Sequence, residues 1–151
     1  MPGWRLHIRR GRRTDFTAVM GLLAASGLPI PPPDRATLRR FRHIVADLGA
    51  DFYLALVDGD LAGLVHVTYA RELTMGQRAG LDQLLVAKAF RRRGIGTALL
   101  DFAQRRAQGR GCSALCCALP SAAAAHHFLE KAGLQPGGKW LVKVLSDRHA
   151  A

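Results

Sequence analysis

The pattern of apolar and polar residues divides the chain into short strands and amphipathic helices. Residues 4–9 alternate with the period of two that is typical of a half-buried strand. Two segments then repeat apolar residues at helical spacing, one after Thr14–Asp15 and one after Asp34, whose side chains are suited to helix N-termini. We expect these helices to end near Gly27 and Gly49.

The remainder of the pattern predicts a hairpin followed by alternating strands and helices. Asp58-Gly59 separates two apolar runs, 52–57 and 61–71, and this dipeptide favours a tight turn. The later elements are a strand at 81–87, a helix at 94–109, a strand at 112–119, a helix at 121–132 and a last strand at 140–145. The order β-α-α-β-β-β-α-β-α-β predicts a mixed α+β fold.

One stretch, Leu81 to Leu100, joins an apolar strand to a helix through a basic glycine turn. The residues of this turn are Arg91, Arg92, Arg93, Gly94, Ile95, Gly96 and Thr97. A glycine turn that opens a helix presents unpaired backbone N–H groups at the positive end of the helix dipole, where phosphate binds well. Arginine adds donors that suit phosphate oxygens, so the turn is a candidate phosphate site.

Two common phosphate-binding loops do not fit this turn. Leu99 stands where a dinucleotide-binding fingerprint has its third glycine, and no Gly-x4-Gly-Lys-Ser/Thr segment occurs in the chain. A second interpretation of the turn stays open, in which the glycines only make the corner between strand and helix.

Length and composition favour one compact domain over residues 1–151. Hydrophobic residues make up 49% of the chain, but no apolar run is long enough to span a membrane. The basic segment 1–13 lacks the apolar centre of a signal peptide, so we expect a cytoplasmic protein.

The formal charge of +11 arises from 22 basic and 11 acidic residues, and only four of the basic residues are lysine. Such a charge favours an anionic ligand and is compatible with nucleic acid. No nucleic-acid motif is present, however, and the arginines are spread along the chain.

Three cysteines and two histidines raise the question of a zinc site: Cys112, Cys116, Cys117, His126 and His127. The two adjacent cysteines lie on a predicted strand and should point to opposite faces, and no Cys-x2-Cys pair occurs. We therefore expect buried thiols rather than a metal site, in a reducing compartment.

Arg91-x-x-Gly94-x-Gly96 after an apolar strand resembles the acyl-CoA signature of the GNAT N-acetyltransferase superfamily. A second segment, Phe128–Leu134, resembles the Phe-Tyr-Glu-Lys-x-Gly-Phe helix end of that family. The resemblance covers nearly the whole chain from about Arg5. It implies the GNAT acyl-CoA N-acyltransferase fold, which has a central, mostly antiparallel, twisted sheet flanked by about four helices.

The resemblance also implies an activity. A primary amine of a small molecule, peptide or protein would attack the thioester of acetyl-CoA directly. The backbone of Leu84, Leu85 and Val86 would pair with the pantetheine arm, and an N–H near Leu85 or Val86 would face the thioester oxygen. Residues 91–97 would hold the pyrophosphate. We expect no membrane partner, and a monomer or homodimer.

Asp82 stands close to the position where many relatives carry a glutamate, which makes it a candidate base for the amine. A solvent-facing or ion-paired carboxylate is the alternative interpretation. Glu72, His66, Tyr69 and His126 are weaker candidates.

Two positions depart from the family pattern. Leu129 replaces the tyrosine that protonates the departing thiolate, and Ala122 replaces an asparagine. Thiols have a pKa near ~8.5, so a thiolate leaves without a dedicated acid. The departures nevertheless keep an alternative open, a non-catalytic module of this fold that binds CoA, nucleic acid or another anion.

Overall fold

The computed structural model describes residues 4–74, 76–118, 123–137 and 143. Residues 1–116 form one compact unit and residues 117–151 form a second. The strands and helices, in chain order, are β1 (Leu6–Arg10), η1 (Arg13–Asp15), α1 (Phe16–Ala25), α2 (Arg35–Ala46), β2 (Asp51–Val57), β3 (Asp60–Glu72), β4 (Gly76–Val86), η2 (Lys88–Phe90), α3 (Ile95–Gly109), β5 (Ala114–Cys117) and α4 (Ala123–Lys131). The expected strand at 140–145 lies outside the described residues.

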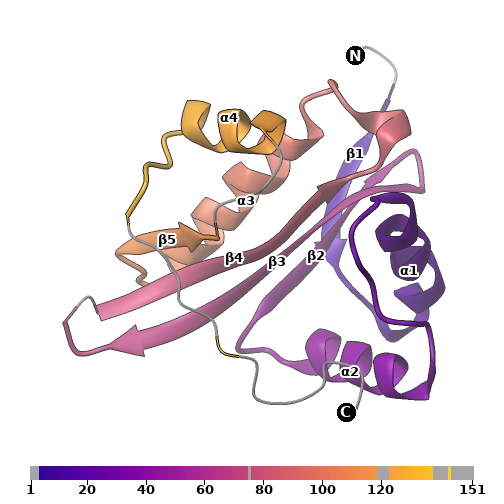
Figure 1. The fold of residues 1–151 in the computed structure, drawn as a ribbon, viewed down its shortest axis with the longest axis horizontal. Helices are drawn as coiled ribbons and strands as arrows, with labels where there is room; N and C mark the ends of the chain where they lie inside the picture. Colours follow the sequence, from indigo (N-terminus) through magenta and orange to yellow (C-terminus); the bar gives the residue numbers. More distant parts are fainter. Residues whose placement is uncertain (1–3, 75, 119–122, 138–142, 144–151) are drawn as a thin grey trace. The chain divides into compact units, whose positions relative to one another are not determined.

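The strands form one sheet in the order β1-β2-β3-β4-β5 (Figure 1). Among the first four strands, each pairs in the antiparallel direction with the next one: β1 with β2, β2 with β3, and β3 with β4. The β2–β3 turn is the expected one: Asp58 and Gly59 have φ angles of 50° and 89°, the left-handed values that a two-residue hairpin requires. The predicted α+β class and the mostly antiparallel sheet are confirmed.

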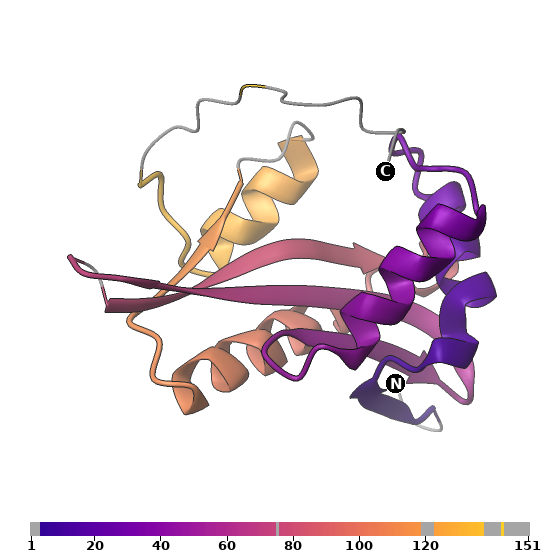
Figure 2. The ribbon, with the colours of Figure 1, turned by 90° about the horizontal axis from the view of Figure 1, so that it is seen from below.

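The two faces of the sheet pack against different helices. Phe52, Leu54 and Leu64 belong to a core cluster with residues of α1 and α2. Their strand neighbours point the other way: the Tyr53 ring lies 4.6 Å from the Phe102 ring of α3, which lies below the strands in Figure 2. Both faces of β2 are therefore covered, which explains why DFYLALV is almost continuously apolar.

The helix starts differ in how they are capped. Asp34 caps α2 as expected, since its carboxylate accepts a hydrogen bond from the Thr37 N–H at 3.0 Å. Asp15 precedes α1, but its carboxylate binds Arg9 and the Arg12 N–H instead. Helix α2 ends at Ala46 rather than Gly49, because Asp47 is already extended.

Within the part of the chain that the structure describes, no helix has both the length and the apolar character needed to cross a bilayer.

Candidate active site

At the end of β4, the N–H groups of successive residues point to opposite edges of the strand. Ala87 N–H donates to the Ala62 carbonyl at 2.7 Å, and Leu85 lies opposite Leu64 in the β3–β4 register. Because the direction alternates along an antiparallel strand, the N–H of Leu85 points toward β3. The N–H groups of Leu84 and Val86 point to the other edge. Of the two donors that we considered for the thioester oxygen, the geometry therefore favours Val86 over Leu85, and it adds Leu84.

Strand β5 does not cover that other edge beside Leu84 and Val86. The contact between Ser113 and β4 is made at Gln77, whose carbonyl accepts from the Ser113 N–H at 2.8 Å. The four residues of β5 extend for about 13 Å, whereas Gln77 and Leu84 are about 23 Å apart along the strand. Among the described residues, β5 is therefore too short to pair with Leu84 and Val86, and it leaves these strand-edge groups to an extended ligand chain.

The glycine turn follows directly and has the conformation expected of an anion site. Gly94 is the N-cap of α3 with φ 78°, and no side chain caps the helix. The first N–H that pairs with the Gly94 carbonyl is that of Ala98, at 3.0 Å. The N–H groups of the first helical turn, Ile95 to Thr97, have no partner within the helix. A Cβ added at Gly94 would meet no atom within 4 Å, so space is open there.

The three arginines of the turn are exposed, and two of them are oriented by neighbours. Arg91 Nε donates to the Val86 carbonyl at 3.3 Å. The Arg93 guanidinium lies 5.5 Å from the centre of the Phe90 ring. Arg92 has a left-handed φ of 63°, which is uncommon for a side chain of this size. Strain of this kind is often found at ligand-binding turns.

Asp82 lies at an irregularity in the β3–β4 ladder. Gln83 lies opposite His66 and Leu81 lies opposite Val67, so Asp82 is an extra residue with no partner of its own. Its exposed carboxylate accepts a hydrogen bond from Thr68 Oγ1 at 2.6 Å. The bulge therefore changes the direction of the Asp82 side chain, two residues before Leu84, the first of the strand-edge donors.

His66 is half-buried near Asp82 and packs edge-on against Phe52, with ring centres 5.5 Å apart. Burial lowers its pKa below the ordinary value, and the charges of Asp82 and Asp47 oppose this only in part. The imidazole is therefore neutral at pH 7 and able to accept a proton.

Two other candidate bases are already engaged. Glu72 forms an ion pair with Arg78 at 2.8 Å. Tyr69 donates to Asp51, and both burial and this contact raise its pKa, so the phenol stays protonated. The side chain of His126 lies outside the described residues.

A pocket of about 240 Å³ adjoins the end of β4 on the α1 face of the sheet. Its lining is mostly small or apolar, from Ala18, Gly21, Leu22, Ala25, Ser26, Leu61, Leu85, Val86 and Ala87, with Lys88 and Arg91 as its charged members. The pocket therefore brings Val86 and the arginine turn next to a cavity with room for a small ligand.

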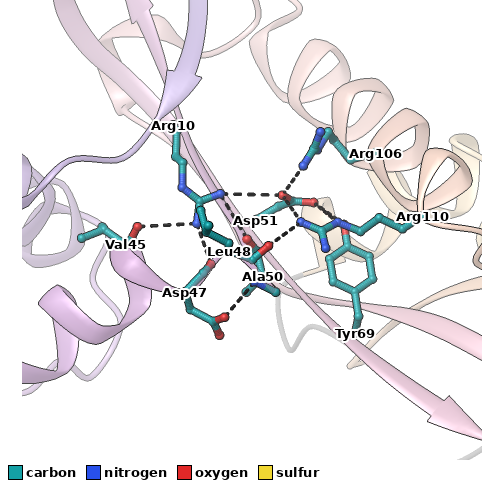
Figure 3. A network of polar contacts seen from close by, with 10 residues as sticks. Arg10, Val45, Asp47, Leu48, Ala50, Asp51, Tyr69, Arg106 and Arg110 are labelled. Atoms are coloured by element: carbon teal, nitrogen blue, oxygen red, sulfur yellow. Dashed lines mark hydrogen bonds and ion pairs between the residues drawn. The ribbon is translucent and has the colours of Figure 1, made fainter.

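A buried network around Asp51 was not predicted from the sequence (Figure 3). This carboxylate is 1% exposed and accepts hydrogen bonds from Arg106 at 2.8 Å, Arg110 at 3.0 Å and the Tyr69 hydroxyl. Burial raises its pKa, but these donors outweigh burial and lower the pKa to about 2. The network ties the start of β2 to the end of α3, the helix that the glycine turn opens.

The cysteines form no disulfide. Among the described residues, no group of three or more His, Cys, Asp and Glu side chains is arranged to hold a metal ion.

A comparison with known protein families shows to which family the chain belongs. The model of the Acetyltransferase (GNAT) family matches residues 17–134. The chain belongs to this family. The match includes both segments on which the resemblance rests, the glycine turn and the end of α4, so the expected GNAT fold is confirmed.

Several solved structures have the same fold. A transcriptional regulator from Bacillus halodurans superposes with a TM-score of 0.84 at 25% identity, over 93% of this chain and 100% of the other. Glucosamine-6-phosphate N-acetyltransferase from Arabidopsis thaliana gives 0.77 at 17% identity, over 94% and 99%. An aminoglycoside N-acetyltransferase solved with CoA gives 0.76 at 21% identity, over 98% and 99%. No curated protein sequence matches the chain.

Proposed function

We propose that this GNAT protein is an N-acetyltransferase that moves the acetyl group of acetyl-CoA to a primary amine by direct attack. One observation carries the proposal: the N–H groups of Leu84 and Val86, which point away from β3, run directly into the glycine turn that opens α3. This arrangement suits a ligand with an extended amide chain at one end and a pyrophosphate at the other. The aminoglycoside acetyltransferase solved with CoA gives independent support for this choice of ligand.

In this proposal, the strand edge binds the pantetheine arm and the turn binds the pyrophosphate. The cofactor-binding residues are Leu84, Leu85, Val86, Arg91, Arg92, Arg93, Gly94, Ile95, Gly96 and Thr97. Leu85 contributes its side chain at the pocket rather than its N–H. The family match at 17–134 runs across residues 116 and 117, which supports one acetyltransferase domain over 1–151.

The chemistry follows from these positions. The amine nitrogen attacks the thioester carbonyl carbon, the N–H of Leu84 or Val86 stabilises the developing oxyanion, and the C–S bond breaks. Asp82 removes the proton that the amine must lose, directly or through water. The thiolate leaves without an acid from position 129 and takes its proton from water. The pocket beside Val86 receives the body of the acceptor.

Thermal unfolding with and without acetyl-CoA tests the cofactor site. A ligand at ~100 times its Kd adds about 2.7 kcal/mol of stability, which raises the Tm of a domain of this size by about 5–11 °C. We expect this shift in the wild type and its loss in Gly94→Glu. Gly76→Glu is the matched control, because Gly76 also has a left-handed φ, of 73°, with open space at its Cβ position. Loss of the shift in both variants, or no shift in the wild type, would contradict the proposal.

Release of CoA thiol with a panel of amines then tests turnover. The second candidate function is a domain that binds CoA without transferring the acetyl group, favoured by Leu129 at the position of the family's acid. A thermal shift with no thiol release for any amine would support that candidate. Amine-dependent thiol release would exclude it.

A further inference from the structure

Helix α2 presents a row of arginines to solvent. Arg35, Arg39 and Arg42 are exposed and recur at i, i+4 and i+7, which places them on one face of the helix. The buried residues Thr37 and Phe41 lie on a different face. We call Arg35, Arg39 and Arg42 the arginine row.

No acidic side chain neutralises this row among the described residues. The ion pairs there join Arg9 to Asp15, Arg78 to Glu72, and Arg10, Arg106 and Arg110 to Asp51. The nearest acid in sequence, Asp34, directs its carboxylate to the Thr37 N–H. The arginines that stabilise the fold are thus a different set from those on α2.

The row is unfavourable for the helix that carries it. Arg35 and Arg39 are four residues apart and Arg39 and Arg42 are three apart, and each like-charged pair at this spacing costs ~0.2–0.5 kcal/mol. Arg35 is also the first residue of α2, where the helix dipole disfavours positive charge. A bound polyanion would remove both penalties.

The neighbouring turn adds exposed positive charge near α2. η1 contacts α2, and its residue Arg13 and the preceding Arg12 are exposed. Because these two arginines and the arginine row come from residues 12–42, they are separate in sequence from the arginines of the glycine turn.

The chemistry of this surface favours nucleic acid over a lipid membrane. Arginine binds phosphate oxygens through two parallel hydrogen bonds, whereas a helix that binds membranes inserts apolar side chains. The apolar side of α2 is already buried, and the exposed large apolar residues, Leu28, Leu48 and Leu73, lie outside α2. The row runs from Arg35 to Arg42, about 10 Å along the helix, which matches the length occupied by about six charges of a nucleic-acid duplex.

We propose that the arginine row binds the phosphate backbone of a nucleic-acid duplex without reading its base sequence. This surface is separate from the acetyl-CoA site, so the inference stands whether or not the protein transfers acetyl groups.

Fluorescence anisotropy with labelled RNA and DNA duplexes of about 20 base pairs tests the proposal. The full chain is measured with saturating CoA, so that the duplex does not compete for the glycine turn. We expect Arg35→Gln, Arg39→Gln, Arg42→Gln to weaken binding about tenfold or more and to reduce the slope of log K against log salt by about 2–3. The control is Arg5→Gln, Arg71→Gln, Arg105→Gln, which removes the same charge from exposed arginines elsewhere. We expect less than a ~3-fold loss in this control.

Three results would overturn the proposal. The first is no binding of either duplex by the wild type. The second is an equal loss in both triple variants, which would indicate a general effect of net charge. The third is binding to phosphatidylglycerol vesicles, but not to the duplexes, that depends on the arginine row. A Tm of the triple variant without ligand that is no lower than the wild-type Tm verifies that α2 is still folded.

Discussion

The carboxylate of Asp51 accepts a hydrogen bond from Nη2 of Arg106 at 2.8 Å, although 55 positions separate the two residues. Arg106 lies in the last turns of α3 and Asp51 is the first residue of β2. Arg10 Nη1, on β1, lies 4.0 Å from the same carboxylate and donates to the Ala50 carbonyl, and Nη2 of the same guanidinium donates to the Asp47 carbonyl. One buried negative charge thus holds the end of β1, the start of β2 and the end of α3 together.

Asp51→Asn should therefore destabilise the protein strongly. The substitution leaves the guanidinium groups of Arg106 and Arg110 without their counter-charge, and breaking a buried ion pair costs about 3–5 kcal/mol. For a domain of this size, the Tm should fall by about 6–20 °C. Asp60→Asn is the control, because Asp60 is exposed. A Tm within a few degrees of wild type for both variants would contradict the role of Asp51.

The same carboxyl should make stability depend on pH below 4. The pKa of Asp51 in the folded protein is about 2, against an ordinary value of 3.8. As the pH falls below 3.8, the unfolded chain binds the proton first, so the stability present above that pH is lost as the pH approaches 2. The difference corresponds to about 2 kcal/mol. Urea unfolding at pH 5, 4 and 3 should show a smaller loss in Asp51→Asn than in the wild type.

Gly63→Ala should destabilise the sheet at the active site. An added Cβ would lie 2.6 Å from the Leu85 carbonyl oxygen and 3.1 Å from Leu99 Cδ1, and the carbonyl belongs to the ladder. Overpacking of this kind costs about 1–3 kcal/mol, which is measurable by urea unfolding. Because Gly63 lies opposite Val86, the shift in Tm with acetyl-CoA should also decrease. Wild-type stability in this variant would contradict the prediction, because it would mean that β3 and β4 move apart to accommodate the Cβ at no cost in free energy.

Gly21→Leu tests the pocket beside Val86. Gly21 lies within α1 and lines the pocket, and an added Cβ meets no atom within 4 Å, so the leucine has room to enter. Leucine favours helices more than glycine does, so stability should not fall. We expect the Tm shift with acetyl-CoA to remain and kcat/KM for the amine to fall about tenfold or more. Unchanged kinetics would place the acceptor elsewhere.

Asp82→Asn tests the proposed base. We expect kcat to fall by about 100-fold, because an amide cannot accept the proton of the amine. Asp101→Asn, at an exposed position of α3, should leave kcat unchanged. His66 is the competing base, and its lowered pKa would place the acid limb of the pH–rate profile below ~6.5. Loss of that limb in His66→Gln, with Asp82→Asn still active, would assign the base to His66.

The sequence by itself determined the features that depend on near neighbours. The hairpin at Asp58-Gly59 and the cap at Asp34 were predictable, because each is decided by residues within a few positions along the chain. The same holds for the glycine turn: Gly94 is the N-cap of a helix that ends at Gly109, as the pattern indicated. The family resemblance rested on this turn together with Phe128–Leu134 and the order of the elements, which are also sequence features, so the fold was recognisable as well.

Only the tertiary structure decided which groups of the site are usable. Leu85 and Val86 are equivalent in the sequence. Pairing with β3 directs the N–H of Leu85 toward β3, whereas the N–H of Val86 points to the other edge of β4. The bulge that isolates Asp82 likewise exists only once β3 and β4 are aligned. Asp51 lay just before the predicted strand at 52–57 and was not singled out, because its partners, Arg106 and Arg110, are 55 and 59 positions away. Strand register and long-range charge pairing depend on how distant segments pack, and local sequence patterns do not encode that packing.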